Sequence, residues 1–231
     1  MFKGNRKYYW ALGLVFVAIV VIEYMRPIPV SWRKTYLAKD KAPFGCYAIF
    51  KLMEDTYAQK VTTNKQSIYN LQEQTTYENT SLLLVNDKAE FSKLDVKKAY
   101  AFMEVGNKLC ICANDFNGLL ADTFKIETSN NWSGFFQNMD SALKKSNYEV
   151  RYINPKNNLL KHYAYPEAAS ETHFTSFDTA KFKVMAVNAD NYPVLLKAKI
   201  GRGELYLSSV PDAFTNIFIV KHPNQIGRAH V

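Results

Sequence analysis

The sequence predicts an α/β domain that follows a single membrane-spanning helix, and three observations support this fold class. The first is an apolar segment over residues 8–24, which no later part of the chain approaches in length. The second is a pair of short apolar runs, residues 81–86 and 108–113, separated by a segment with helical spacing. The third is the last third of the chain, which has a β-rich pattern.

The N-terminal apolar segment has the length of a transmembrane helix, for which roughly 20 apolar residues are needed. Tyr8, Tyr9, Trp10 and Tyr24 frame it, as aromatic residues do at membrane interfaces. A cleavable signal peptide is the main alternative, but no small-x-small cleavage site follows the apolar core. We therefore expect an uncleaved anchor over residues 8–25.

The charges that flank the anchor suggest its orientation. Lys3, Arg6 and Lys7 lie in a short tail, residues 1–7, and favour a cytoplasmic N-terminus by the positive-inside rule. Basic residues beyond the anchor oppose this bias. We expect a single span in the inner (cytoplasmic) membrane, the lipid bilayer as a partner, and an extracytoplasmic body.

The formal net charge is +8, from 29 basic and 21 acidic residues. The basic residues are spread along the chain and form no stripe, so the composition argues against a nucleic-acid partner. Basic residues beside the anchor are better explained by attraction to anionic lipid headgroups.

The chain has three cysteines, Cys46, Cys110 and Cys112. An odd count excludes a framework in which every cysteine is paired within the chain. Cys110 and Cys112 alternate on one strand-like run, so we expect both as small buried side chains on one face. A metal site would need more ligands nearby, and the four histidines are scattered. We predict no metal and no cofactor.

The elements follow in chain order. Residues 26–39 form a juxtamembrane linker whose prolines stop the anchor helix, and a turn-rich stretch then leads into a helix over residues 46–57. Residues 67–79 are polar and irregular or partly helical. Ser92 is a fair N-cap for a helix that extends to residue 104, and Gly106 ends it. With the apolar runs on either side, this helix forms a βαβ unit and implies a parallel strand pair.

The C-terminal part reads as strands over residues 149–153 and 182–188. A hairpin over residues 192–200 and 204–209 turns at the glycines around Arg202. Between these strands lies a region that reads as irregular and contains two histidines, His162 and His173. We interpret both as histidines in surface loops.

Three segments together resemble a known family. They are the turn at residues 40–45, the strand 82–86 with its following helix and residues 106–109, and residues 200–209 followed by Pro211 and residues 214–216. In order and spacing they are similar to the DUF4350 family of bacterial membrane proteins over about residues 40–220. The last segment is the most specific of the three.

The resemblance implies a Rossmann-like or flavodoxin-like domain of the class I glutamine-amidotransferase type over residues 40–220. Members of the family typically carry one span before this domain and one after it, and their biochemical role is unassigned. Residues 226–231 resemble the translation of a sequencing-library adapter, so we expect a truncated frame in which a second span is lost.

The strand ends argue against catalysis. An amidotransferase-type nucleophile sits on a tight strand-to-helix turn, commonly Gly-x-Cys-x-Gly. The predicted strands are followed by Asn86-Asp87 and by Asn114-Asp115, and neither turn offers a cysteine or serine. We therefore predict no catalytic residue.

Asp87, Asn114 and Asp115 nevertheless lie where open α/β sheets bind ligands, at the carboxyl ends of strands. A polar ligand there is one interpretation, and simple capping of loops and helices is the other.

The sequence thus favours a non-catalytic, membrane-anchored domain that acts as an interaction or transport-accessory subunit of an envelope complex, with a membrane protein as its partner. The alternative is a ligand-sensing or hydrolytic domain that uses a pocket at the strand ends.

Overall fold

The structure, a computed structural model, describes residues 6–26, 30–57, 60–74, 77–129, 148–153, 161–165 and 172–221. It divides into two compact units, Met1–Ser31 and Trp32–Val231. The first unit contains α1 (Arg6–Met25), a 20-residue helix. Within Lys7–Met25, an 18-residue window has a mean hydropathy of 1.8, so α1 is long and apolar enough to cross a membrane.

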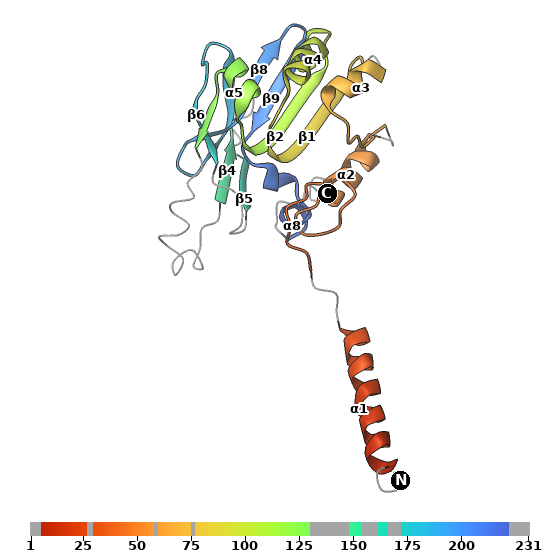
Figure 1. The fold of residues 1–231 in the computed structure, drawn as a ribbon. Coiled ribbons are helices and arrows are strands. Elements are labelled where there is room, and N and C mark those ends of the chain that lie inside the picture. Colours follow the sequence, from red (N-terminus) through yellow and green to blue (C-terminus); the bar gives the residue numbers. More distant parts are fainter. Residues whose placement is uncertain are drawn as a thin grey trace. The chain divides into compact units, whose positions relative to one another are not determined.

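The second unit, called the body below, combines a seven-stranded sheet, a two-stranded sheet and several short helices (Figure 1). Its strands are β1 (Ser81–Lys88), β2 (Lys108–Asp115), β3 (Glu127–Ser129), β4 (Tyr148–Tyr152), β5 (Lys161–Tyr165), β6 (His173–Ser176), β7 (Phe182–Asn188), β8 (Pro193–Ile200) and β9 (Gly203–Ser208). Its helices are α2 (Tyr47–Thr56), α3 (Ile68–Gln74), α4 (Lys93–Glu104), α5 (Gly118–Phe124), the 3₁₀-helix η1 (Pro211–Phe214) and α8 (Asn216–Lys221).

The large sheet is mixed, with the strand order β1-β2-β9-β8-β7-β4-β5. β1, β2 and β9 are parallel, and each remaining neighbour pairs antiparallel. The predicted parallel pair is confirmed by β1 and β2, in which Leu82 lies opposite Leu109. The predicted hairpin is confirmed by β8 and β9, in which Ile200 lies opposite Gly203. The α/β class is therefore correct, and the parallel strands bring three carboxyl ends to one edge.

A capping box explains where helix α4 begins, and a glycine explains where it ends. Ser92 Oγ accepts from the Asp95 backbone N at 3.1 Å, and the Ser92 backbone N donates to the Asp95 carboxylate at 3.3 Å. This reciprocal capping box satisfies two amides of the first turn. Just beyond the last turn, Gly106 has a φ of +111°, a backbone conformation that favours glycine.

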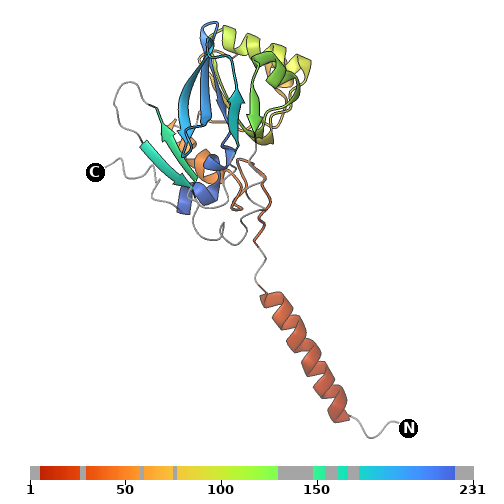
Figure 2. The ribbon, with the colours of Figure 1, turned by 90° about the vertical axis from the view of Figure 1, so that its left-hand side faces the viewer.

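The main core lies on one face of the large sheet. Leu109, Ile111 and Leu207 point toward α4 and α5 and are no more than 2 % exposed. From α4, Phe102 and Met103 pack against them. Both helices therefore cover the same face of the sheet, and Figure 2 shows this arrangement from the side.

The opposite face is covered mainly near the strand carboxyl ends. There, Phe44 packs on Phe218 with ring centroids 6.4 Å apart, in a second core cluster. Farther along the same face, Leu83, Cys110 and Tyr206 are only half-buried. We call this part, around those three residues, the open face. Cys112 is fully buried as predicted, but Cys110, which lies on the same face farther from the carboxyl end of β2, is only half-buried.

The interpretation of both histidines as residues of surface loops is wrong, because both lie in strands and His173 is only 5 % exposed. His162 lies in β5 opposite Arg151 of β4, and His173 lies in β6 opposite Ser129 of β3. Both strands are short, and β6 finds its partner more than 40 residues away in the chain. Pairing of this kind leaves no local signal, since a short strand has too few residues to show periodicity.

Candidate functional site

The parallel strands bring two of the predicted site residues together. Asn86 pairs with Ala113 and Lys88 pairs with Asp115, which sets Asp87 beside Asn114 at the carboxyl edge. Asn114 Nδ2 donates to Asp87 Oδ1 at 2.8 Å. Asp87 is exposed, whereas Asn114 is buried. The two therefore form a polar pair at the surface of the sheet edge.

The third predicted residue, Asp115, has a different role. Its carboxylate accepts from Asn117 Nδ2 at 2.6 Å, and its backbone O accepts from the Ala89 backbone N at 2.8 Å. The alternation of side chains along β2 directs it away from the face that carries Asn114. Asp115 thus organises the turn after β2 and does not join the polar pair.

Three residues that the sequence analysis did not select complete the cluster. Tyr36 OH lies 3.3 Å from Asn114 Nδ2, from which it accepts, and donates to Asp212 Oδ1 at 2.7 Å. Lys34 Nζ donates to Asp212 Oδ2 at 2.8 Å. The Asp212 side chain is 0 % exposed. A chain of polar contacts therefore runs from Lys34 to Asp87, and we call these five residues the strand-end cluster.

The segment that carries Lys34 and Tyr36 was assigned to the juxtamembrane linker from the sequence, and from Trp32 onward it lies within the body. We call residues 32–46 the strap. The Tyr36 backbone N donates to Phe44 O at 3.0 Å, and the Cys46 backbone N donates to Leu37 O at 3.0 Å. These bonds close the strap on itself.

The strap is also bound to the C-terminal helix α8. The backbone N of Asn216 donates to Gly45 O at 2.8 Å, and the backbone N of Ile217 donates to Pro43 O at 2.9 Å. Asn216 Nδ2 donates to the backbone O of Ala42 at 2.7 Å. The strap and α8, the last helix among the described residues, therefore lie side by side.

Tyr36 adopts an unusual backbone conformation to reach the cluster. Its φ is +51°, in the left-handed region where a bulky residue is strained by about 1–3 kcal/mol. Burial raises the pKa of the Tyr36 hydroxyl well above its ordinary range, and the nearby Asp212 carboxylate raises it further. The hydroxyl therefore stays protonated and serves as a hydrogen-bond donor.

One acceptor in the cluster has no partner among the described residues. Asn114 Oδ1 is buried and receives no hydrogen bond there, while Nδ2 of the same amide contacts two oxygens. The amide cannot be turned around, because Oδ1 would then face the Asp87 carboxylate. A buried polar atom without a partner is costly, by roughly 1–3 kcal/mol.

The Cys46 thiol, which lies near Asp212, is not activated as a nucleophile. Burial raises the pKa of Cys46, the residue before α2, to about 12, and the Asp212 carboxylate adds to the effect. Such a thiol stays protonated, whereas a nucleophilic cysteine acts as the thiolate. His173 lies in β6 and stacks on Tyr192, with ring centroids 4.3 Å apart.

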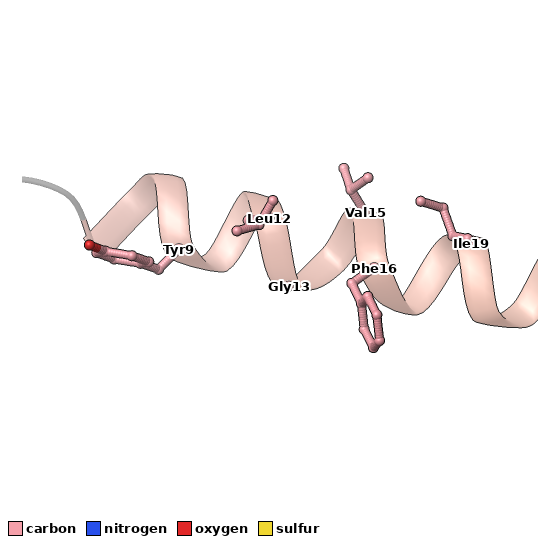
Figure 3. A pocket seen from close by; sticks show the side chains of 6 residues that line it. All are labelled: Tyr9, Leu12, Gly13, Val15, Phe16 and Ile19. Carbon is pink, nitrogen blue, oxygen red and sulfur yellow. The ribbon is translucent and has the colours of Figure 1, made fainter.

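Two hollows complete the survey of the described surface. One lies next to Asp115, between α5, β3 and β6, and its polar lining includes Asp122, Glu127 and Thr175. The other is a shallow apolar groove on α1 around Gly13, lined by residues such as Tyr9 and others of the same helix (Figure 3). A groove on one apolar helix carries no polar group for chemistry and suits contact with lipid chains.

Comparisons with known proteins give one match that spans most of the chain. The family model described as "Domain of unknown function (DUF4350)" matches residues 38–225. No curated protein matches the sequence.

Among solved structures, partial matches occur to glycoside hydrolases. A β-galactosidase from Bacillus circulans sp. alkalophilus has a TM-score of 0.34 at 15 % identity and aligns with 55 % of this chain and 20 % of its own. An exo-β-1,4-mannosidase from Opitutaceae bacterium strain TAV5 has a TM-score of 0.32 at 9 % identity, over 52 % and 19 %. A GH42 β-galactosidase from G. stearothermophilus has a TM-score of 0.41 at 13 % identity and aligns with 79 % of this chain and 26 % of its own. The chain spans about a fifth to a quarter of the length of these structures, and such scores are too low to assign a fold or an activity.

Proposed function

We propose that this chain, which belongs to the DUF4350 family, is a membrane-anchored, non-catalytic α/β domain that acts as an interaction or accessory subunit of an envelope complex. One observation carries the proposal. The carboxyl edge of the parallel strands, where open α/β sheets hold ligands, is occupied by the chain's own strap, whose Lys34 and Tyr36 bind Asp212 of η1.

The chemistry at that edge supports a binding role. Asp212 uses both carboxylate oxygens for contacts within the chain, to Lys34 and Tyr36. The nearby Cys46 thiol is held in its protonated form by burial. A domain whose strand ends are closed by its own residues is better suited to holding a shape than to turning over a substrate.

The same proposal includes the fold type of the body, the orientation of the anchor and the class of partner. We assign the body to the Rossmann-like, class I glutamine-amidotransferase type, in line with the three adjacent parallel strands. We assign α1 to the inner membrane and the body to its outer side, in line with the basic tail before the anchor. A transport-related membrane protein is the expected class of partner.

The open face is the surface through which we expect the partner to bind. Leu83, Cys110 and Tyr206 are half-buried there, while Leu109, Ile111, Leu205 and Leu207 on the helix-covered face of β2 and β9 are no more than 2 % exposed. This partly exposed patch, bordered by the Lys197–Glu204 ion pair, is the surface that we assign to the partner.

Photo-crosslinking in native membranes tests this proposal. A photo-reactive amino acid at Leu83 reports on the open face, and the same group at Leu119 of α5, which is 46 % exposed, is the matched control. We expect a discrete crosslinked product of one size from Leu83 and none from Leu119. A strictly monomeric full-length protein that gives no product from Leu83 would contradict the proposal.

A second candidate function is favoured by a separate observation. Asn114 Oδ1 is a buried acceptor without a described partner, and it belongs to the side chain that contacts exposed Asp87. Such a pair suits a small polar ligand with hydrogen-bond donors, which would make the domain a ligand sensor. A crystal structure of the full-length protein decides this: one ordered water on Oδ1 would remove the need for a ligand, and a bound donor group would support it.

A further inference from the structure

Two thiols, one of them on the open face, lie in contact on the central strand β2. The sulfur atoms of Cys110 and Cys112 are 3.6 Å apart, within the range of an S–H···S hydrogen bond. Both cysteines are free. The i, i+2 spacing directs both side chains to the same face of the sheet, so the contact follows from strand geometry.

The two thiols have different access to solvent. Cys112 lies between Val85 of β1 and Ser208 of β9 and is 0 % exposed. Cys110 lies between Leu83 and Tyr206 on the open face and is half-buried. A reagent from solvent therefore reaches Cys110 first.

The proton between the two sulfur atoms is held unequally. Either sulfur could donate, but full burial of Cys112 favours its neutral thiol, so we take its S–H as the donor to Cys110. This hydrogen bond lowers the pKa of Cys110, and the same bond, together with burial, raises the pKa of Cys112 well above the ordinary value. The thiol that is accessible is thus also the one that ionises more readily.

We propose that Cys110 and Cys112 form a reversible dithiol–disulfide pair on the open face, with an external disulfide as the oxidant. The Cys110 thiolate attacks one sulfur of the external disulfide, which forms a mixed disulfide and releases one thiolate. Cys112 then attacks the Cys110 sulfur, and its proton passes to the departing sulfur, which leaves as the second thiol. In total, two protein thiols are oxidised to one disulfide and one external disulfide is reduced to two thiols.

The geometry of β2 is unfavourable for a disulfide between Cys110 and Cys112, so this disulfide is easily reduced again. Successive side chains on one face of a strand are about 6.6 Å apart at Cα, near the upper limit for a disulfide. The sulfur atoms must also move from 3.6 Å to about 2 Å. β2 is hydrogen-bonded on both sides, so closure pulls on β1 and β9. Oxidation therefore changes the structure of the sheet at the open face, where the disulfide bond forms.

The experiment uses full-length protein in detergent, equilibrated in buffers with increasing ratios of oxidised to reduced glutathione, then alkylated and digested with trypsin. Cleavage after Lys108 and Lys125 gives one peptide, residues 109–125, with both thiols of the pair. Cleavage after Lys41 and Lys51 gives a separate peptide with Cys46. We expect the first peptide to lose two hydrogens and its alkylation, reversibly with excess dithiothreitol, while the second stays alkylated.

Variants assign the order of the steps. Cys46→Ser should leave the oxidation unchanged, and Cys112→Ser should trap glutathione on Cys110. Cys110→Ser should remove both products, because the buried Cys112 cannot make the first attack. The inference is overturned if wild-type residues 109–125 stay fully alkylated at every glutathione ratio, if Cys112 becomes linked to Cys46 instead, or if glutathione is trapped on Cys112.

Discussion

At the scale of single residues, the strap is held by a few buried polar contacts. Asp212 is enclosed and accepts from Lys34 and Tyr36, whose side chains come from the opposite end of the body's sequence. A buried carboxylate is tolerated only when its oxygens are paired, because the loss of one partner leaves a charge in a poorly solvating interior. The strained backbone of Tyr36 persists because these contacts hold it.

Tyr36→Phe tests this contact. The substitution keeps the ring but leaves Asp212 Oδ1 without its 2.7 Å donor, so we expect the free energy of unfolding to fall by about 1–3 kcal/mol. Chemical denaturation of the full-length protein in detergent measures it. Tyr206→Phe is the control: it removes a half-buried hydroxyl bonded to Glu204 at 2.8 Å, where water can substitute. Equal losses for both variants would contradict the assigned role of Tyr36.

The raised pKa of Cys46 predicts how the stability of the folded protein changes at alkaline pH. Burial raises its pKa from 9.0 to about 12, so the folded state favours the neutral thiol. The contribution of this neutral thiol to the free energy of unfolding is complete below pH 9 and is lost progressively as the pH rises from 9 to 12. We therefore expect Cys46→Ala to flatten part of the decline in melting temperature over this range. Parallel profiles for the variant and the wild type would show that the thiol does not contribute.

At the scale of elements, close backbone approach explains the glycines of the most specific sequence segment. A Cβ on Gly203 would lie 2.1 Å from Asn107 O and 2.3 Å from Met103 O, at the end of α4. The start of β9 is thus pressed against the end of that helix. Asn107 supports the same junction, since its buried side chain donates to Tyr77 O and Phe102 O and accepts from the Thr80 backbone N.

Gly203→Ala should therefore be severely destabilising. Backbone atoms must move to admit the methyl group, and we expect a loss of about 3 kcal/mol or more in the free energy of unfolding. Gly118→Ala is the matched control, because a Cβ there meets nothing within 4 Å and only its φ of +63° is unfavourable. Denaturation curves for both variants give the comparison. A smaller loss at Gly203 than at Gly118 would show that the junction is loose.

At the scale of the whole molecule, the chain consists of an apolar helix and a body with its own core. The body contains the strap, the large sheet and both hydrophobic clusters within Trp32–Val231. α1 exposes its apolar side chains, including Leu14, Phe16 and Ile19. A helix of this kind is stable in a bilayer and unfavourable in water.

Removal of residues 1–25 should release the body from membranes. We expect full-length protein to stay in the membrane fraction after a carbonate wash and the shortened protein to move to the supernatant. An unrelated apolar helix fused in place of residues 8–25 should restore retention. If the shortened protein remained in the membrane fraction, a second attachment would be required.

Protease treatment of spheroplasts tests the orientation. We expect digestion of the body from outside, because the basic tail before the anchor favours the cytoplasm. Protection in intact spheroplasts, with digestion only after lysis, would place the body in the cytoplasm and reverse the predicted topology.

The sequence by itself determined the elements whose signals are local: the anchor helix, α4 with its capping box, the β1–β2 pair and the β8–β9 hairpin. It also located Asp87 and Asn114 at one edge, because parallel strands must end together. The DUF4350 resemblance likewise rested on local segments.

Only the tertiary structure decided what meets that edge. Lys34 and Tyr36 contact Asp212 across 178 and 176 residues, and no spacing pattern reports a contact of that kind. The same holds for β6, which pairs with distant β3, and for Cys110, which is half-buried although Cys112 on the same face is fully buried. Periodicity records how a segment repeats along its own axis, whereas burial depends on what the rest of the chain packs against it.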